Sequence, residues 1–361
     1  FRSEDVFGMS DAVLSPAPPH IEEAANPPLP PALVLAIETP YWELARQLSR
    51  AELAYLADTD TAIGVLAAVG GSGQLNWQLA TGAAGALAGR IREDYAPLLR
   101  ITAALPRSEA TASGVPVTVL SNPERLAVGD YAYLVDAGGA LREAVAILAF
   151  DPGNATIDLA RGVLDTTPQA HPATTRLMGA GDWLASEGVE RAPGEAVFVA
   201  AIPHTGSGAG AAALADNGNP LILAGRQARP YPPGRIRLNG QSDPAAVAGD
   251  LTLTWAHRDR IQQTAHLVRQ DEIDIGPEPG TTYTLRIHDR NGALVRTETG
   301  ITGTSHVWDT ATAATDAGVL GDTVTIEIES LRAGWQSWQP QQRTTIRAGY
   351  GLRYGQYWGG V

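Results

Sequence analysis

The sequence predicts a mainly β protein: two small β-rich domains followed by an antiparallel β-sandwich. First, the 361 residues include 39 Gly and 25 Pro, which divide the chain into short runs. Second, several runs alternate apolar and polar residues, such as Leu-Thr-Leu-Thr-Trp at 251–255. Third, Asp289-Arg290-Asn291-Gly292 separates two strand patterns, and Asn-Gly in that position indicates a tight hairpin. Short strands bounded by turn residues are typical of sandwiches and barrels.

Residues 1–31 are expected to form a Pro-rich arm, because its prolines disfavour helix and favour an extended path. The prolines are Pro16, Pro18, Pro19, Pro27, Pro28, Pro30 and Pro31. Two interpretations stay open: a solvated linker, and an arm that binds a neighbouring subunit.

The first domain is predicted at 32–108, as a small β-rich (α+β) unit. Ser49-Arg50-Ala51-Glu52 is a capping-box pattern and predicts a short helix after it. Gly70-Gly71-Ser72-Gly73 is expected to be the hairpin turn between two strands, and Trp42 and Trp77 are expected in the core. The strands predicted here are 33–38, 63–69 and 75–79.

The second domain, 109–228, is predicted to be a small β barrel or sandwich. Turns are expected at Gly138-Gly139 and at 151–154. The Gly/Ala-rich segment 204–219 indicates a long surface loop or a short helix. The strands predicted here are 115–120, 131–136, 144–150, 155–160 and 196–202.

The third domain, 229–346, has the clearest alternation. Leu251, Leu253 and Trp255 fall on one face of a strand, and 283–288 forms another. In 323–329 the apolar residues are expected inward and the two acids, Glu327 and Glu329, outward. A Pro-rich stretch, then an early Trp strand, in a chain without Cys, resembles a fibronectin type III module. Residues 347–361 form a Gly/aromatic C-terminal tail.

Short segments within and before this third domain support a second resemblance. In chain order they are Asp165-Thr166-Thr167-Pro168-Gln169-Ala170-His171, 229–233, 255–260 and 276–283, with 38–44 further upstream. The sequences of these segments, and their order along the chain, resemble the C-terminal half of tail-tip (baseplate hub) proteins of tailed bacteriophages, including those of gene-transfer-agent type. The resemblance runs from about residue 30 to the end.

This resemblance implies a structural virion protein located at the tail tip or baseplate. It implies a homo-oligomer, a trimer by analogy, that binds fibre, distal tail or tip proteins and takes part in host attachment. Relatives of this family carry further domains upstream. Since the first residue is Phe1, the chain is expected to be the downstream part of a longer polypeptide.

Bulk composition excludes several functions. A formal net charge of −13 disfavours nucleic-acid binding. The absence of Cys excludes thiol chemistry and Cys-based metal sites, and the cationic side chains are all Arg, which excludes a Schiff-base or P-loop lysine. No cofactor, metal ligand or catalytic residue is therefore expected, and the chain is predicted not to be an enzyme.

Three motifs imitate enzyme sites. Gly206-Ser207-Gly208-Ala209-Gly210-Ala211 is close to a dinucleotide-binding turn, but Asn217-Gly218-Asn219-Pro220 breaks the helix that a pyrophosphate would need. Ser207 lies near His204 without the Gly-x-Ser-x-Gly context of a nucleophile elbow. Asp271-Glu272 or Glu327 with Glu329 could supply a carboxylate pair, so a cell-wall glycosidase is the second alternative function.

Charged residues elsewhere are given structural interpretations. Arg258 and Arg260, on either side of Asp259, could bind an anion, but a structural ion-pair network is the preferred interpretation. His171 is expected to be a hydrogen-bonded histidine in a loop between domains.

Aromatic residues near the C-terminus are the candidate partner or receptor contacts. Exposed Trp and Tyr side chains supply rigid contact area for proteins or sugars. The candidates are Trp335, Trp338, Tyr350, Tyr354, Tyr357 and Trp358. Trp335 or Trp338 could instead close one end of the sandwich. The first alternative function is therefore a receptor- or glycan-binding adhesin module, whose partner would be a host cell-surface receptor.

Overall fold

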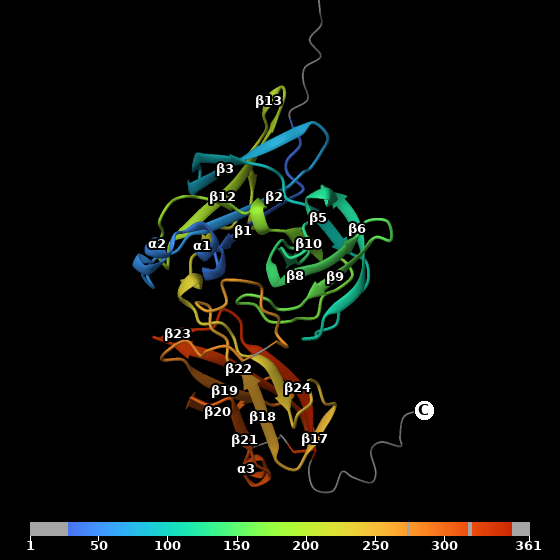
Figure 1. Cartoon of the computed structure of the whole chain (residues 1–361), viewed down its shortest axis with the longest axis vertical. Coiled ribbons are helices and arrows are strands. Elements are labelled where there is room, and N and C mark those ends of the chain that lie inside the picture. The colour runs from blue at the N-terminus through green and yellow to red at the C-terminus, as the bar shows by residue number, and fades with distance from the viewer. Residues whose placement is uncertain (1–27, 273, 317–319, 349–361) are drawn as a thin grey trace, which may run out of the picture.

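The computed structural model describes residues 28–348, apart from 273 and 317–319. It is mainly β and consists of an N-terminal body and a C-terminal sandwich (Figure 1). Most of the predicted arm, and the tail from residue 349 with its four aromatic contact candidates, lie outside the described residues. No helix in the described part is long and apolar enough to cross a membrane.

The N-terminal body contains a closed barrel, whose strand order is β10-β5-β6-β9-β8-β7. The strands are β5 (Leu98–Ile101), β6 (Ala112–Ser121), β7 (Tyr131–Val135), β8 (Leu141–Asp151), β9 (Thr156–Ala160) and β10 (Arg176–Gly179). Alternate residues of each strand face opposite sides. One set, which includes Leu134, Val145 and Leu159, forms one apolar cluster, and the other set, which includes Tyr131 and Tyr133, forms a second.

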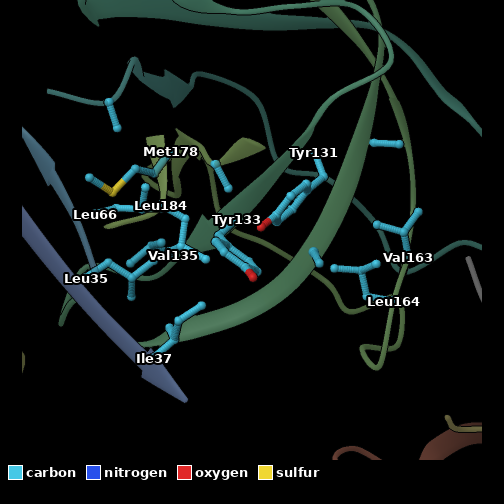
Figure 2. Packing of buried hydrophobic residues seen from close by; sticks show 14 of the residues in the cluster. Leu35, Ile37, Leu66, Tyr131, Tyr133, Val135, Val163, Leu164, Met178 and Leu184 are labelled. Carbon is cyan, nitrogen blue, oxygen red and sulfur yellow. The ribbon is translucent and has the colours of Figure 1, made fainter. Parts of the chain in front are cut away.

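Two further sheets pack beside the barrel. One contains β1 (Leu33–Glu38), β2 (Ile63–Ala68) and β11 (Ala185–Ser186). The other contains β3 (Gln74–Ala83), β4 (Ala86–Glu93) and β12 (Ala196–Thr205), with β13 (Gly208–Ala209), β14 (Ala213–Leu214) and β15 (Leu221–Ile222) on β12. Figure 2 shows Leu35, Ile37 and Leu66 of the first sheet packed with Tyr133 and Val135 of the barrel.

Short helices lie in the connections between strands. They are α1 (Tyr41–Gln47), α2 (Arg50–Tyr55) and the 3-10 turns η1 (Pro123–Arg125), η2 (Gly181–Trp183), η3 (Asp216–Gly218) and η4 (Arg226–Ala228). The predicted capping box is confirmed: the Ser49 hydroxyl accepts from the Glu52 amide, and Glu52 accepts from the Ser49 amide. Trp42 and Trp77 are both buried, as expected.

The sandwich has two sheets. The first contains β16 (Gly234–Leu238), β18 (Leu251–Ala256) and β21 (Ser305–Trp308). The second has the order β17 (Ala246–Ala248), β24 (Gln341–Ala348), β22 (Asp322–Arg332), β19 (Thr282–His288) and β20 (Leu294–Ile301), with β23 (Trp335–Gln336) on β22 and α3 (Thr310–Thr315) between β21 and β22. Without the short β17 and β23, the described sandwich has seven strands. The first, second and fifth along the chain (β16, β18 and β21) form one sheet, and the other four (β19, β20, β22 and β24) form the second. This is a fibronectin type III-like arrangement.

The sandwich strands predicted at 251–255, 283–288 and 323–329 are all confirmed. The Asn-Gly hairpin is confirmed too, since Asp289 Oδ1 accepts from the amides of Asn291 and Ala293, each at 2.8 Å. One expectation was incomplete. Glu329 is only 6% exposed, because Arg286 covers it through an ion pair.

The predicted boundary between residues 108 and 109 is wrong as a division of the N-terminal body. Strand β5, at 98–101, lies before that boundary yet closes the barrel between β10 and β6. Strand β12, expected in the second domain, pairs with β3 from the first. Alternation identifies a strand and its buried face, but it carries no information about which distant strand supplies the hydrogen bonds.

Two loop predictions also change. Gly70–Gly73 is not a hairpin turn, because β2 pairs with β1 and β11 whereas β3 pairs with β12 and β4. Glycine is needed at position 70 because an added Cβ would lie 1.8 Å from the Pro30 carbonyl oxygen. The segment 204–219 contains two short strands and η3.

Candidate functional site

Five segments that are far apart in the sequence meet where the sandwich joins the N-terminal body. They are 38–44, 165–171, 229–233, 255–260 and 276–283, which are the segments that carry the hub-protein resemblance. We call this region the junction. It is built largely from buried charged and polar side chains.

Arg226 and Asp165 form the central ion pair of the junction. The Arg226 guanidinium donates from Nε and Nη2 to the two Asp165 oxygens, at 2.6 and 2.8 Å, and both side chains are buried. Burial by itself lowers the pKa of Arg226, but the adjacent Asp165 carboxylate outweighs it and raises that pKa above its usual value. A bidentate pair of this kind fixes both distance and orientation.

Glu38 joins the same group from β1. Its Oε1 accepts from the Arg226 amide at 2.7 Å and its Oε2 from the Ala224 amide at 2.6 Å. The Thr61 hydroxyl donates to Oε1 at 2.5 Å. The segment that leads into the sandwich is therefore attached to the first strand of the N-terminal body.

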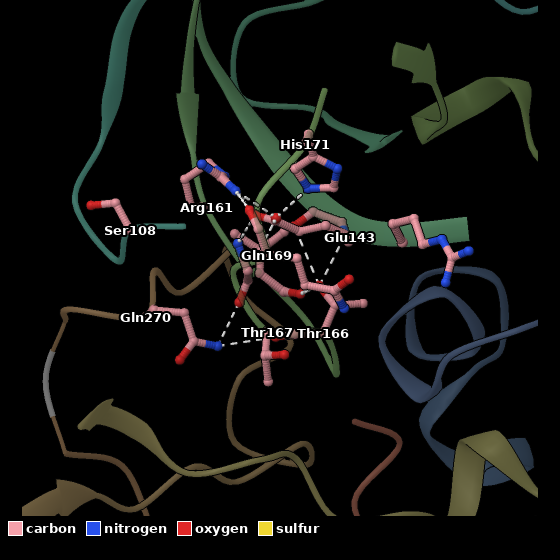
Figure 3. A network of polar contacts seen from close by, with 12 residues as sticks. Ser108, Glu143, Arg161, Thr166, Thr167, Gln169, His171 and Gln270 are labelled. Carbon is pink, nitrogen blue, oxygen red and sulfur yellow. Dashed lines mark hydrogen bonds and ion pairs between the residues drawn. The ribbon is translucent and has the colours of Figure 1, made fainter. Parts of the chain in front are cut away.

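Glu143, on β8, is the centre of a second network, shown in Figure 3. Arg161 donates to both carboxylate oxygens, at 2.7 and 2.8 Å, and His171 Nε2 lies 2.8 Å from Oε2. The amides of Gly162 and Gln169 donate to Glu143 as well. Burial raises the pKa of Glu143, but the hydrogen bonds from His171 and Arg161 outweigh burial and hold that pKa below its ordinary value.

This network holds a loop in place, and it does not expose the Glu143 carboxylate as a general base. Glu143 is 0% exposed, and its two oxygens accept five hydrogen bonds. The 165–171 loop that it anchors contacts the sandwich, where the Thr167 amide donates to Gln339 Oε1 at 2.9 Å. His171 is buried and hydrogen-bonded, as expected.

Arg258, Asp259 and Arg260 have three different roles. Arg260 pairs with Glu278 at 3.0 Å and lies over the Tyr41 ring, with 4.7 Å between its Cζ and the ring centroid. Asp259 instead accepts from the amides of the two residues that follow Arg260, and so stabilises a turn. The expected ion-pair network therefore exists, but its acid is Glu278 and not Asp259.

Arg258 is fully buried and none of its hydrogen bonds goes to a carboxylate. Its Nε donates to Gln263 Oε1 at 2.9 Å, and its Cζ lies 5.6 Å from the centroid of the Tyr231 ring. Burial lowers the pKa of Arg258 to about 10. Its Nη2 donates to the Leu164 carbonyl, which adds another link between the sandwich and the N-terminal body.

Further links lie at the edges of the junction. Gln270 Nε2 donates to the carbonyls of Gly162 and Thr166, at 2.6 and 3.1 Å, and its Oε1 accepts from Gln341. Glu109, from the N-terminal body, pairs with Arg237 at 2.5 Å and also with Arg343, both in the sandwich.

The structure places Trp335 and Trp338 at the junction, where both are partly buried. The Arg229 guanidinium lies 5.4 Å from the Trp335 ring, and that of Arg226 lies 4.9 Å from the Trp338 ring. Gly225 contacts Trp335 so closely that an added Cβ would lie 2.7 Å from its ring. These two tryptophans thus have intramolecular partners.

Trp338 also lines a cleft beside the junction, with a volume of about 210 Å³. Leu35 and Ile37 form part of its wall, and the exposed residues Asp216 and Asn219 lie at its rim. The cleft is mostly apolar with a few polar groups, which is the usual composition of a small-molecule site.

The motifs that imitate enzyme sites are not assembled into sites. Residues 206 and 207 are the turn of the β12–β13 hairpin, in which His204 pairs with Ala209, and Ser207 Oγ lies 2.9 Å from the Thr205 hydroxyl. Glu327 and Glu329 both pair with Arg286, and Glu272 accepts from the Arg269 amide. Across the described residues, no group of three potential ligands could hold a metal ion.

Sequence reasoning missed the residues that matter most in the junction. These are Glu38, Glu143, Arg161, Arg226 and Glu278. Four of them are single charges between uncharged residues, as in Ala160-Arg161-Gly162, whereas Glu143 directly follows Arg142, so the sequence offers only a weak signal for any of the five. Nothing in the sequence indicates which charges pair.

Comparisons with known proteins show only distant likenesses to solved structures. No family model and no curated protein matches the chain. Among solved structures, a two-domain fibronectin type III segment of chicken tenascin has 10% identity and a TM-score of 0.21, over 70% of this chain and 99% of that one. The FN1–FN3 domains of chicken CNTN1 have 12% identity and a TM-score of 0.23, over 89% and 100%.

A third solved structure, the BSP domain of a biofilm-associated protein, has 10% identity and a TM-score of 0.20, over 88% of this chain and 52% of that one. At such TM-scores these likenesses carry no conclusion about fold or function. The fibronectin type III-like description of the sandwich rests on its own strand order.

Proposed function

We propose that the chain is a non-enzymatic structural component of a phage tail tip, in the position of the baseplate hub. One observation carries this proposal: the separate segments that resemble hub proteins converge at the junction. Each segment is short by itself. Their meeting at one buried junction gives them a shared physical role, which is to fix the sandwich on the N-terminal body.

The junction suits a part that must hold its shape under load. Its ion pairs are buried and bidentate, as in Arg226 with Asp165 and Arg161 with Glu143. Removing one partner of a buried pair costs about 3–5 kcal/mol, because a charge is left without compensation. The sandwich and the N-terminal body should therefore move as one unit.

In this proposal, the protein assembles with sister subunits, as a trimer by analogy, and with fibre, distal tail or tip proteins. The formal net charge of −13 is consistent with protein partners and not with nucleic acid.

Labelling of intact particles tests the proposal. A tagged chain should be found at the tail tip by electron microscopy with a gold-labelled antibody. Asp165→Asn, which leaves Arg226 unpaired, should reduce incorporation into particles. The matched control is Asp182→Asn, whose side chain is 83% exposed, and it should incorporate normally. Label at another position, or none in any particle, would refute the proposal.

The cleft favours a second candidate function, a glycan-binding adhesin. Trp338 offers an aromatic surface there, and Asp216 and Asn219 offer hydrogen-bonding groups at the rim. If this function is correct, the isolated protein binds host envelope, and Trp338→Ala abolishes binding. Trp335→Ala is the control, because Trp335 does not line the cleft. Loss of binding in both variants would instead indicate damage to the junction.

No observation favours the glycosidase alternative, and we expect the protein to leave peptidoglycan intact. The candidate carboxylates Glu327 and Glu329 are engaged by Arg286.

A further inference from the structure

The sheet of β3, β4 and β12 has one covered face and one open face. Strand register places Trp77, Leu79 and Val199 on the covered face, where they join an apolar cluster. The opposite face carries Phe198 and Ile202 of β12, which are partly buried. The open face is therefore the one that a ligand can reach.

The open face is hollowed into a groove of about 600 Å³. This volume lies within the range of about 300–1,000 Å³ typical of binding pockets. All eight lining residues are Ala, Gly, Leu, Ile or Phe. The small ones leave room for a ligand, and the large ones, Leu87, Phe198, Ile202 and Leu214, supply apolar contact area.

The chemistry of the lining indicates what kind of molecule the groove can hold. None of the eight lining side chains carries a nitrogen or an oxygen atom. The backbone of β3 below the groove is already paired, with β12 on one side and β4 on the other. A peptide or a sugar buried here would give up hydrogen bonds to water without gaining new ones. An alkyl chain has no such groups, and its burial is favourable.

A polar end adjoins this apolar groove on the same face. In the strand register, Arg92 of β4, Gln78 of β3 and Ile202 of β12 form one row across the sheet. His204 lies two residues beyond Ile202 and so faces the same side. Burial and the positive charge of Arg92 lower the pKa of His204 below its ordinary value, so the two side chains lie within electrostatic range.

Both side chains of this polar end can interact with an anion. Arg92 is exposed, so its guanidinium is accessible. The Nε2 atom of His204 is buried and has no hydrogen-bond partner among the described residues. An anionic group placed between them would offset the charge of Arg92 and could accept a hydrogen bond from His204.

We propose that the groove binds a long-chain fatty acid, with its carboxylate at Arg92 and His204. The alkyl chain lies along β12, past Ile202 to Phe198. The residues Phe198 and His204 are six positions apart on this strand, which corresponds to about 20 Å and accommodates the alkyl chain of dodecanoate. The apolar lining determines the body of the ligand, and the charge at one end determines its direction. The inference is independent of the proposed function.

Calorimetric titration of the full chain with dodecanoate, below the concentration at which it forms micelles, tests the groove. Binding should be saturable, with one site per chain. Leu214→Asp should weaken it at least about tenfold, because it places a charge in the apolar lining. The matched control is Val307→Asp, at a 51% exposed apolar residue on the sandwich, and its affinity should equal that of the wild type. Thermal melting checks that each variant folds. Absence of saturable binding, or equal affinities in the two variants, would overturn the proposal.

A comparison of dodecanoate with dodecanol tests the polar end. Arg92→Gln should weaken the binding of dodecanoate about tenfold and leave that of dodecanol unchanged, because only the carboxylate carries a charge. Arg142→Gln is the matched control, since Arg142 is a 52% exposed arginine on β8, and it should bind both ligands as the wild type does. An unchanged affinity of Arg92→Gln for dodecanoate, or an equal loss for both ligands, would show that no anionic head lies at Arg92 and would refute the proposal.

Light scattering after size exclusion tests a second copy of the chain as the occupant. The mass of the particle should be the same with and without saturating dodecanoate. A fall in mass on addition of dodecanoate would show that another copy covers the groove, and the assignment to a fatty acid would be wrong.

Discussion

The sandwich and the N-terminal body differ in how their strands are distributed along the chain. All strands of the sandwich come from one continuous stretch, from β16 to β24, and its core is a single apolar cluster. In the N-terminal body, the barrel strands β5–β10 lie between β4 and β12 in the sequence, although β12 pairs with β3. A continuous domain can be recognised from local patterns, whereas an interleaved one depends on pairings between distant segments.

The sandwich core and the junction also differ in what they bury. The sandwich core consists of residues such as Leu253, Trp255 and Ile326. The junction buries charged groups from both regions, among them Glu143 with Arg161, Asp165 with Arg226, and Arg260 with Glu278 of the sandwich. Apolar contacts are non-directional, while bidentate ion pairs require one geometry. The sandwich is therefore stabilised by its core, and its placement on the body is specified by charge.

The largest effect is expected when the two regions are produced as separate fragments. Residues 229–348 should fold alone, because they contain both sheets of the sandwich. Residues 109–228 should not fold, because they lack β5 of the barrel and the β3 partner of β12. Circular dichroism and thermal melting distinguish a cooperative transition from none. A cooperatively folding 109–228 fragment would contradict the interleaved description.

Trp255→Ala should lower the free energy of unfolding by about 3–5 kcal/mol, as expected for truncation of a buried aromatic side chain. Trp255 is 3% exposed and packs edge-on against Tyr283 with 5.3 Å between ring centroids. Urea unfolding of the 229–348 fragment measures the change. A loss below about 1 kcal/mol would show that the sandwich core is not organised around this strand.

Arg161→Met should cost about 3 kcal/mol, somewhat less than the Trp255 change. It leaves Glu143 buried without its bidentate partner, but Glu143 can limit the penalty by taking up a proton. Arg142→Met is the matched control: Arg142 is 52% exposed, its pair with Asp136 lies at the surface, and such pairs contribute at most about 1 kcal/mol. Urea unfolding of the full chain should separate the two variants, and similar losses would contradict a special role for buried charge.

Acid should remove part of the contribution that Glu143 makes to the free energy of unfolding. The pKa of its carboxyl is below the ordinary 4.5 in the folded protein, because hydrogen bonds from His171 and Arg161 outweigh burial. Its stabilising contribution is therefore complete above about pH 4.5 and is lost as the pH falls through the lower folded pKa. The difference in unfolding free energy between the wild type and Glu143→Gln should narrow over that range. A constant difference from pH 6 to pH 3 would disprove this account.

Ser49→Ala should have the smallest effect, about 1 kcal/mol or less, because it removes one capping hydrogen bond. Helix α2 has no buried residue, so its loss should stay local. Hydrogen exchange should accelerate at the α2 amides and remain unchanged in the barrel. Faster exchange throughout the N-terminal body would show that α2 supports more than itself.

The sequence by itself determined the mainly β fold, the strands of the sandwich with their buried faces, the Asn-Gly hairpin and the capping box. Each of these depends on residues that are neighbours along the chain: alternation with a period of two, a turn, or a side chain three residues from its acceptor. The burial of Trp42 and Trp77 also follows from their residue type alone.

Only the tertiary structure decided the rest: the closure of the barrel by β5, the pairing of β12 with β3, and the partners of the charged residues. Arg260 was expected beside Asp259 but pairs with Glu278, and Trp335 and Trp338 contact Arg229 and Arg226. A charge interacts with whichever opposite charge the fold brings within a few ångströms, and sequence separation does not limit that choice. The sequence therefore shows the junction only as separate short segments, which the fold brings together.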